Sequence, residues 1–188
     1  MIEKPIGYDE APIFGTGDFE GITPGGHVCR IKTARVEAAQ DKPRRLVIAF
    51  DLAEPDEQAG YYDRAYKVRQ QQTPLDAKWP GIYRQGLDGK STPFFKGLIT
   101  SIENSNPGYT WAWDESTLKG KLFGGLFGRE EYVGDDGKKH WSCKCVAVRS
   151  VEGITDVPAP DDKPCQEPAQ GGGAANTYGG APLDDLPF

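Results

Sequence analysis

The sequence predicts a mainly β domain in which five strands form a Greek-key barrel and one helix lies between the third and fourth strands. Two observations support this prediction. Between residues 23 and 154, several short segments have apolar side chains at every second position and are separated by turns that contain Gly, Pro or Asp. Residues 91–104 instead have apolar side chains at helical spacing. Three strands, a helix and two strands follow each other in the OB fold, which we therefore expect for residues 23–154.

The first two strands come directly from this alternation. Pro24-Gly25-Gly26 forms a turn, and residues 27–36 follow it as the first strand. Its alternation places Arg30 and Lys32 on one face. The second strand, residues 45–52, has the clearest period of two, and its inner face carries Leu46, Ile48, Phe50 and Leu52.

Residues 61–70 are expected to form the third strand. One face of this strand would carry Tyr62, Arg64, Tyr66 and Val68, and the other would carry Ala65, Lys67 and Arg69. The following segment, which extends to about residue 92, shows no period and is long for a structureless connection. We expect it to be a functional flap over the strands that presents Trp79, Tyr83 and Arg84.

The helix and the last two strands complete the predicted barrel. The helix begins near Ser91 or Thr92 with Pro93 in its first turn, and residues 104–108 end it. Its apolar stripe is typical of core packing, so we expect the helix to close one end of the barrel. Residues 118–132 and 139–149 form the last two strands, and the turn Asp136-Gly137 joins them.

Two polar segments flank the domain. Residues 1–22 are expected to be a lead-in that crosses the domain surface. Residues 155–188 are rich in Pro and Gly and are expected to be a disordered tail, because they cannot bury enough apolar surface to offset their ordering entropy. The net charge of −6 is uneven: residues 1–20 carry −4, residues 155–188 carry −5, and the body between them carries +3. A basic body between acidic ends suits a protein that binds a polyanion and carries an interaction tail.

The last residues of the sequence, Asp184, Asp185, Leu186, Pro187 and Phe188, have the composition of a docking peptide. The ring of Phe188 would fill an apolar pocket on a partner. Basic residues around that pocket would bind the terminal carboxylate together with Asp184 and Asp185.

This end resembles the acidic tip of bacterial single-stranded DNA-binding proteins, in which aspartates precede Ile or Leu, Pro and Phe. In that family an OB fold holds the strand, and the tip recruits replication and recombination proteins such as a helicase, primase, polymerase, recombinase or nuclease. The body is similar to small proteins encoded by phages and prophages beside recombination and replication genes. The stretches that carry this second resemblance are Pro24-Gly25-Gly26, Cys29–Lys32, Leu46–Asp51, Phe95–Gly97, Glu103–Gly108, Leu118–Lys121 and Glu130–Tyr132. The resemblance implies a single-stranded DNA-binding protein of phage replication or recombination, in the cytoplasm of a bacterial host.

Binding of a single strand without sequence preference requires cations for the phosphates and flat side chains for the bases. Such residues lie on the first and third predicted strands, in the flap, and before the fourth strand. We expect the DNA-binding residues to be Arg30, Lys32, Tyr62, Arg64, Tyr66, Lys67, Arg69, Trp79, Tyr83, Arg84, Trp111 and Trp113.

Other functions remain as alternatives to DNA binding. Asp51, Glu54, Asp56, Asp63 and Lys67 are candidates for a metal-dependent nuclease or resolvase site, although their spacing does not favour catalysis. A protein-binding adaptor would keep the tip and lack a DNA groove. Because the spacing of these carboxylates does not favour catalysis, we expect no enzyme activity and no cofactor.

The four cysteines are expected to be free thiols in a reducing compartment. His140, Cys143 and Cys145, with His27 or Cys29, could ligate zinc, but the alternation of Cys143 and Cys145 also suits two core residues, and we expect no metal. No apolar run reaches the roughly 18 residues of a membrane span. Residues 1–10 lack the features of a secretory signal. The sequence does not determine the oligomeric state, and a homo-oligomer is one of the alternatives.

Overall fold

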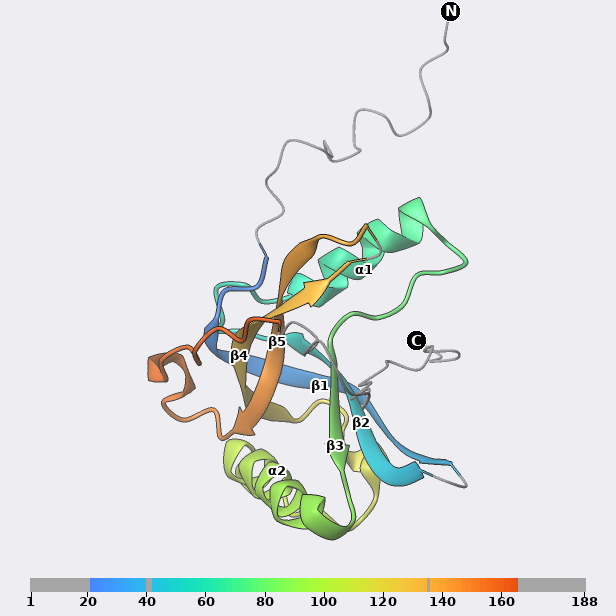
Figure 1. The fold of residues 1–188 in the computed structure, drawn as a ribbon. Coiled ribbons are helices and arrows are strands. Elements are labelled where there is room, and N and C mark those ends of the chain that lie inside the picture. The colour runs from blue at the N-terminus through green and yellow to red at the C-terminus, as the bar shows by residue number, and fades with distance from the viewer. Residues whose placement is uncertain (1–20, 40–41, 135, 166–188) are drawn as a thin grey trace, which may run out of the picture.

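A computed structural model describes residues 21–39, 42–134 and 136–165 of the chain. These residues form a mixed α/β domain with a five-stranded antiparallel sheet and two helices (Figure 1). The predicted lead-in up to residue 20 and the docking residues 184–188 lie outside the described residues. The main elements are β1 (Gly25–Ala39), β2 (Lys42–Leu52), α1 (Tyr61–Gln72), β3 (Ile82–Gly86), α2 (Thr92–Ser105), β4 (Leu122–Val133) and β5 (Lys139–Arg149).

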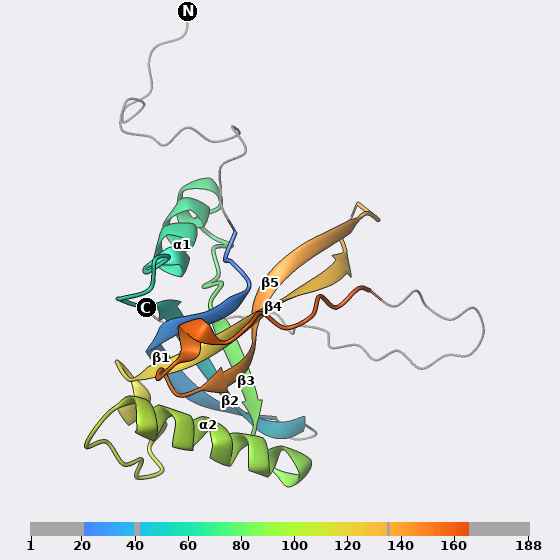
Figure 2. The same cartoon turned by 90° about the vertical axis from the view of Figure 1, so that its left-hand side faces the viewer.

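The sheet is organised around β1, which pairs with β2 along one edge and with β4 along the other. The order of the strands is β3-β2-β1-β4-β5. A register shift between Ile31 and Thr33 marks a bulge in β1, and bulges of this kind increase the local twist of a strand. Beyond its pairing with β1, β4 continues with β5 as a two-stranded arm (Figure 2).

The main core lies on the side of the sheet to which Leu46, Ile48 and Phe50 of β2 point. Leu46, Ile48 and Phe50 of β2 are at most 1 % exposed, as the period of two in this segment predicts. Phe50 meets Phe123 and Phe127 of β4 edge to face, with ring centroids 5.4 and 6.2 Å apart. These rings join β2 and β4 across β1 through apolar burial and aromatic contacts.

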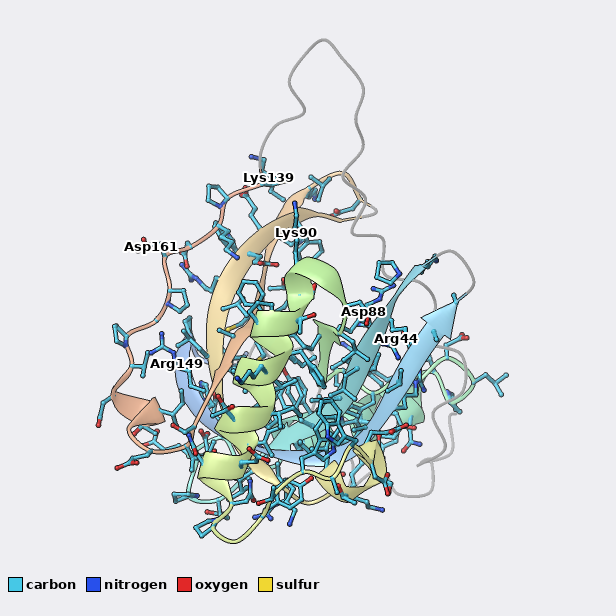
Figure 3. All side chains as sticks on the ribbon, turned by 90° about the horizontal axis from the view of Figure 1, so that it is seen from below. Arg44, Asp88, Lys90, Lys139, Arg149 and Asp161 are labelled. Carbon is cyan, nitrogen blue, oxygen red and sulfur yellow. The ribbon has the colours of Figure 1, made fainter. Side chains whose placement is uncertain are left out.

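Helix α2 confirms the helix predicted near residues 91–104. Leu98 and Ile102 on its apolar stripe are buried, and Pro93 stands in its first turn. The helix crosses one end of the sheet (Figure 3), where it contacts β3, β4 and β5. Arg44 and Asp88 form an ion pair beside it, with 2.6 Å between Nη2 and Oδ1.

The third strand was predicted wrongly. Residues 61–72 form helix α1, and the third strand is β3 in the segment that was expected to be a flap. Helix α1 begins after Gly60, which has no side chain to cap it. Instead, the carboxylate of Asp51 on β2 accepts hydrogen bonds from the N–H groups of Tyr62 and Asp63, at 2.8 and 3.1 Å. A cap supplied by a distant strand therefore fixes the start of this helix.

The described chain continues past the domain boundary expected at residue 155, which falls within the short 3-10 helix η3 (Ile154–Asp156). Ile154 is buried against Val28 and Ala53. Residues 157–165, which we call the C-terminal strap, then run beside the outer edge of β4. The N–H of Lys163 donates to the carbonyl of Arg129, and the N–H of Glu131 donates to the carbonyl of Lys163, both at 2.9 Å. The strap thus pairs with the part of β4 that β1 does not reach.

Candidate nucleic-acid interface

Cations gather on the side of β1, β2 and β3 that lies opposite Leu46 and Ile48. The side chains of Leu46 and Ile48 point into the core, so Arg45 and Val47 point to the opposite side of β2. The register places Arg35 of β1 and Arg84 of β3 on either side of Val47. We call this surface the basic face and define it by Arg30, Lys32, Arg35, Arg45 and Arg84.

Two cations of the basic face have no carboxylate partner among the residues that the structure describes. Within the described part of the chain, Arg45 and Arg84 form no ion pair, and Arg84 is exposed. Arg35 pairs with Glu37 at 2.7 Å, and the guanidinium of Arg30 donates to the carbonyl of Gly120 at 3.2 Å. The side chain of Val47 is only 2 % exposed between its arginine neighbours, whose aliphatic stems can cover it.

Asp63 of helix α1 lies at the border of the basic face. Asp63 lies 3.6 Å from Lys32 and 2.7 Å from Lys67. The hydrogen bond from Lys67 and the charge of Lys32 lower the pKa of Asp63, so this carboxylate stays charged at neutral pH. Lys32 also lies over the ring of Trp79, 4.6 Å from its centroid. Asp63 therefore reduces the charge that Lys32 and Lys67 can offer to a phosphate.

Several residues expected to stack on bases are part of the core. Tyr62 is 7 % exposed and Trp79 is 4 % exposed, and the indole N–H of Trp79 donates to the carbonyl of Phe50 at 3.0 Å. Tyr83 is half-buried and pairs with Ile48 on the inner side of the sheet, and burial raises its pKa to about 12. Tyr66 is half-buried and packs on Trp79, with 5.4 Å between the ring centroids. In this structure, Tyr62 and Trp79 have no ring face open to a base.

The expected site residues of α1 do not form one face, because a helix distributes them around its axis. Arg64, Lys67 and Arg69 are exposed, and Arg64 donates to the carbonyl of Ala59 at 2.7 Å. Trp111 and Trp113 lie elsewhere, in the connection between α2 and β4. The structure therefore brings Arg30, Lys32 and Arg84 onto one surface, places Lys67 at its border, and separates the two tryptophans from it.

Arg35 and Arg45 were not predicted from the sequence as site residues. Both lie in predicted strands. Alternation places Arg45 opposite the core side chains of its strand, so this residue could have been found from the sequence. Strict alternation would put Arg35 on the side of Ile31, and the bulge between Ile31 and Thr33 turns it to the side of Arg30 instead. The hairpin of β4 and β5 was predicted with its turn at Asp136-Gly137, but the apolar side chains that it exposes were not: Tyr132, Val133 and Trp141 are each 46 % or more exposed.

The carboxylates proposed for a nuclease site have structural contacts. Asp51 accepts from the N–H groups of Leu52, Tyr62 and Asp63. Asp56 lies 2.9 Å from Nδ1 of His27 and accepts from the N–H of Val28. Among residues 21–39, 42–134 and 136–165, no three His, Cys, Asp or Glu side chains are arranged to hold a metal ion.

The four cysteines are free thiols. Cys29 is fully buried, and burial raises the pKa of Cys143 to about 11 and that of Cys145 to about 12. Cys165, which was expected in the tail, lies in the strap, and its N–H donates to Glu131 at 2.9 Å. Thiols with such raised pKa values do not act as nucleophiles at neutral pH.

The chain matches no known protein-family model and no curated protein. Neither helix among the described residues is long and apolar enough to cross a membrane.

Proposed function

We propose that this protein binds single-stranded DNA without sequence preference and that the strand lies across the basic face. The observation that carries this proposal is the cross-strand row of Arg35, Val47 and Arg84, with Arg45 beside it. Arginine side chains on adjacent strands can contact successive phosphates while the bases remain accessible to neighbouring rings.

The proposed fold is an OB fold. Its support is the strand order β3-β2-β1-β4-β5 together with the position of α2 between β3 and β4. OB folds bind oligonucleotides on the face of their second and third strands. Arg45 and Arg84 of the basic face lie on β2 and β3, and its other members lie on the adjacent β1.

A binding titration with labelled oligothymidine tests this proposal. The logarithm of the affinity should fall linearly with the logarithm of the salt concentration, by roughly 0.7 for each phosphate contacted. Absence of binding at low salt would contradict the proposal and favour an adaptor that binds only proteins. Binding followed by Mg²⁺-dependent cutting of the oligonucleotide would favour the nuclease alternative.

We further propose that residues 184–188 recruit replication or recombination proteins of a bacterial host to the coated strand. The support is the sequence itself, in which two aspartates precede Leu-Pro-Phe. Together with the resemblance of the body to phage-encoded single-strand binders, this favours a role in phage DNA replication or recombination.

Removal of residues 183–188 separates recruitment from DNA binding. The shortened protein should lose pull-down of host replication and recombination proteins, because Phe188 supplies the anchor. Its affinity for oligothymidine should stay the same or rise slightly at low salt, because Asp184 and Asp185 no longer compete for cations. Loss of DNA binding in the shortened protein would contradict the docking role.

A further inference from the structure

Trp113 has two features that the fold itself does not require. Its indole ring is 79 % exposed, although tryptophan side chains are usually buried. Its φ angle is 64°, and it is the only residue other than glycine with a positive φ in the described part of the chain. A bulky residue in this left-handed region is strained, and strained residues concentrate at functional sites.

The ring of Trp113 packs on Trp111, and Trp111 is itself fixed by hydrogen bonds and a ring contact. The backbone N–H of Trp111 donates to Glu103 of α2 at 2.9 Å, and its indole N–H donates to the carbonyl of Asp114 at 2.9 Å. The ring of Phe95 meets Trp111 edge to face at 5.6 Å. Trp113 then packs on this fixed ring, with 5.0 Å between the centroids and 41° between the planes. One side of the Trp113 ring is therefore supported, and most of the ring is in solvent.

The segment that follows Trp113 leads back to the basic face. Asp114 caps the 3-10 helix η2 (Glu115–Leu118) by accepting from the N–H of Ser116, and Lys119 ends this helix. The four residues of η2 rise by only about 8 Å. The next residue, Gly120, accepts a hydrogen bond from the guanidinium of Arg30, and its N–H donates to the carbonyl of Ile31 at 2.8 Å. One member of the basic face thus contacts the segment that carries the tryptophans.

Three cations lie beside this segment. Arg30 and the exposed Lys119 lie at the end of η2 nearest the basic face, and Lys121 lies over the ring of Tyr109, 4.3 Å from its centroid. The carboxylates of Glu103 and Asp114 accept hydrogen bonds from the backbone N–H groups of Trp111 and Ser116. Cations beside an exposed ring are the combination that single-strand binding requires.

We propose that Trp113 is a second contact site for the strand bound on the basic face, where one base stacks on its exposed ring. Trp111 is a positioning residue that fixes the ring of Trp113. This inference rests on the proposed function and adds to it a path for the strand, which leaves the basic face past Arg30 and Lys119. It predicts that a longer strand gains a contact that a short one cannot reach.

Two substitutions at this position separate the role of the ring from the role of the backbone. Trp113→Ala removes the ring and keeps a residue that disfavours a positive φ. Trp113→Gly removes the ring and relieves the strain, because glycine adopts positive φ without a steric cost. We expect the melting temperature of Trp113→Gly to equal or exceed that of the wild type. Trp141→Ala, which removes an exposed tryptophan from the arm, is the matched control.

The measurement is the anisotropy of labelled oligothymidines of about 4 and about 16 nucleotides, the limits of the site sizes of single OB folds. Both Trp113 variants should bind the long oligonucleotide about 5-fold to 150-fold more weakly than the wild type, as the loss of one stacked base predicts. They should bind the short oligonucleotide as the wild type does, and Trp141→Ala should leave both affinities unchanged.

A failure of the proposed function and a failure of the second contact site give different binding results. If the wild type binds neither oligonucleotide, the proposed function is wrong. If the wild type binds both and the Trp113 variants bind the long one equally well, the second contact site is wrong and the basic face stands. A change in the oligomeric state of the Trp113 variants, seen by size-exclusion chromatography with light scattering, would assign the ring to a contact between copies of the chain and would also overturn the inference.

Discussion

The basic face and the arm of β4 and β5 both carry several cations, but these cations have different partners. On the arm, Arg129 pairs with Asp162 of the strap, and Lys139 and Lys144 pair with glutamates of β4 at 3.5 and 3.7 Å. On the basic face, Arg45 and Arg84 have no carboxylate partner among the described residues. A paired cation must give up its carboxylate before it can bind a phosphate. We therefore expect the pairing of cations, more than their number, to decide where a polyanion binds.

Charge reversal on the two surfaces should give the largest difference in affinity for oligothymidine. Replacing both Arg45 and Arg84 by Glu should lower the affinity for oligothymidine at least about tenfold and reduce the salt slope by roughly 0.7 for each phosphate that the variant no longer binds. The matched double variant, Lys139→Glu with Lys144→Glu, should bind nearly as the wild type does. Equally weakened binding in the two double variants would show that the pairing of cations does not distinguish the surfaces.

A second prediction concerns the helix that borders the basic face. Asp51→Ala should lower the free energy of unfolding by about 1–3 kcal/mol, because two N–H groups of α1 and that of Leu52 lose their acceptor. Burial raises the pKa of Asp51, but removing it still destabilises the fold, since its partners are left without hydrogen bonds. Urea denaturation followed by circular dichroism measures the change. A loss as small as that of an exposed surface substitution would mean that Asp51 does not hold α1.

A smaller effect is expected at the acid that borders the basic face. Asp63→Asn releases Lys32 and Lys67 from their shared carboxylate and should strengthen oligothymidine binding by about twofold to fivefold, the range expected for exposed ion pairs. Asp136→Asn is the control on the arm, where Asp136 contacts His140 at 3.1 Å. Unchanged affinity in Asp63→Asn would exclude Lys32 and Lys67 from the binding surface.

The smallest effect is a pH dependence on the arm. The hydrogen bond from Arg129 lowers the pKa of Asp162 in the folded protein. The stability from this pair is therefore present above the unfolded pKa of about 3.9 and is lost as the pH falls through the lower folded value. Because the pair is exposed, solvent screens it, and we expect only a slight slope. Melting curves between about pH 5 and pH 2 should show a shallower decline for Asp162→Asn than for the wild type. An identical decline would mean that the pair adds nothing.

Most of the sheet and one of the helices could be predicted from the sequence, because they follow from local periodicity. Alternation in residues 45–52 matches β2, and the turn at Asp136-Gly137 lies between β4 and β5. Helix α1 could not be predicted in this way. Tyr62 and Tyr66 are four residues apart, a spacing that places them on one face of a strand and also on one face of a helix. The cap that decides between the two comes from Asp51, ten residues before the helix.

The candidate site was predicted less completely, for a related reason. Arg30, Lys32 and Arg84 face solvent on strands. Alternation predicted this for Arg30 and Lys32, and Arg84 was expected in the segment thought to be a flap. Tyr62 and Trp79 are buried because α1 and the segment after it pack on β2, a tertiary contact that no local pattern shows. The strained backbone of Trp113 likewise depends on the contacts of the neighbouring Trp111 with α2.

The close packing of η3 on the sheet has a consequence for the order in which the chain folds. A Cβ atom at Gly26 would lie 1.7 Å from the carbonyl oxygen of Ile154, and one at Gly124 would lie 2.8 Å from the side chain of Ile154. Ile154 therefore packs directly on the backbone of two glycines, one on β1 and one on β4. This packing surface forms only once the two strands are paired. Gly26 pairs with Leu126, about one hundred residues later in the chain. We therefore expect η3 and the strap to dock after the pairing of β1 with β4, which joins distant parts of the chain.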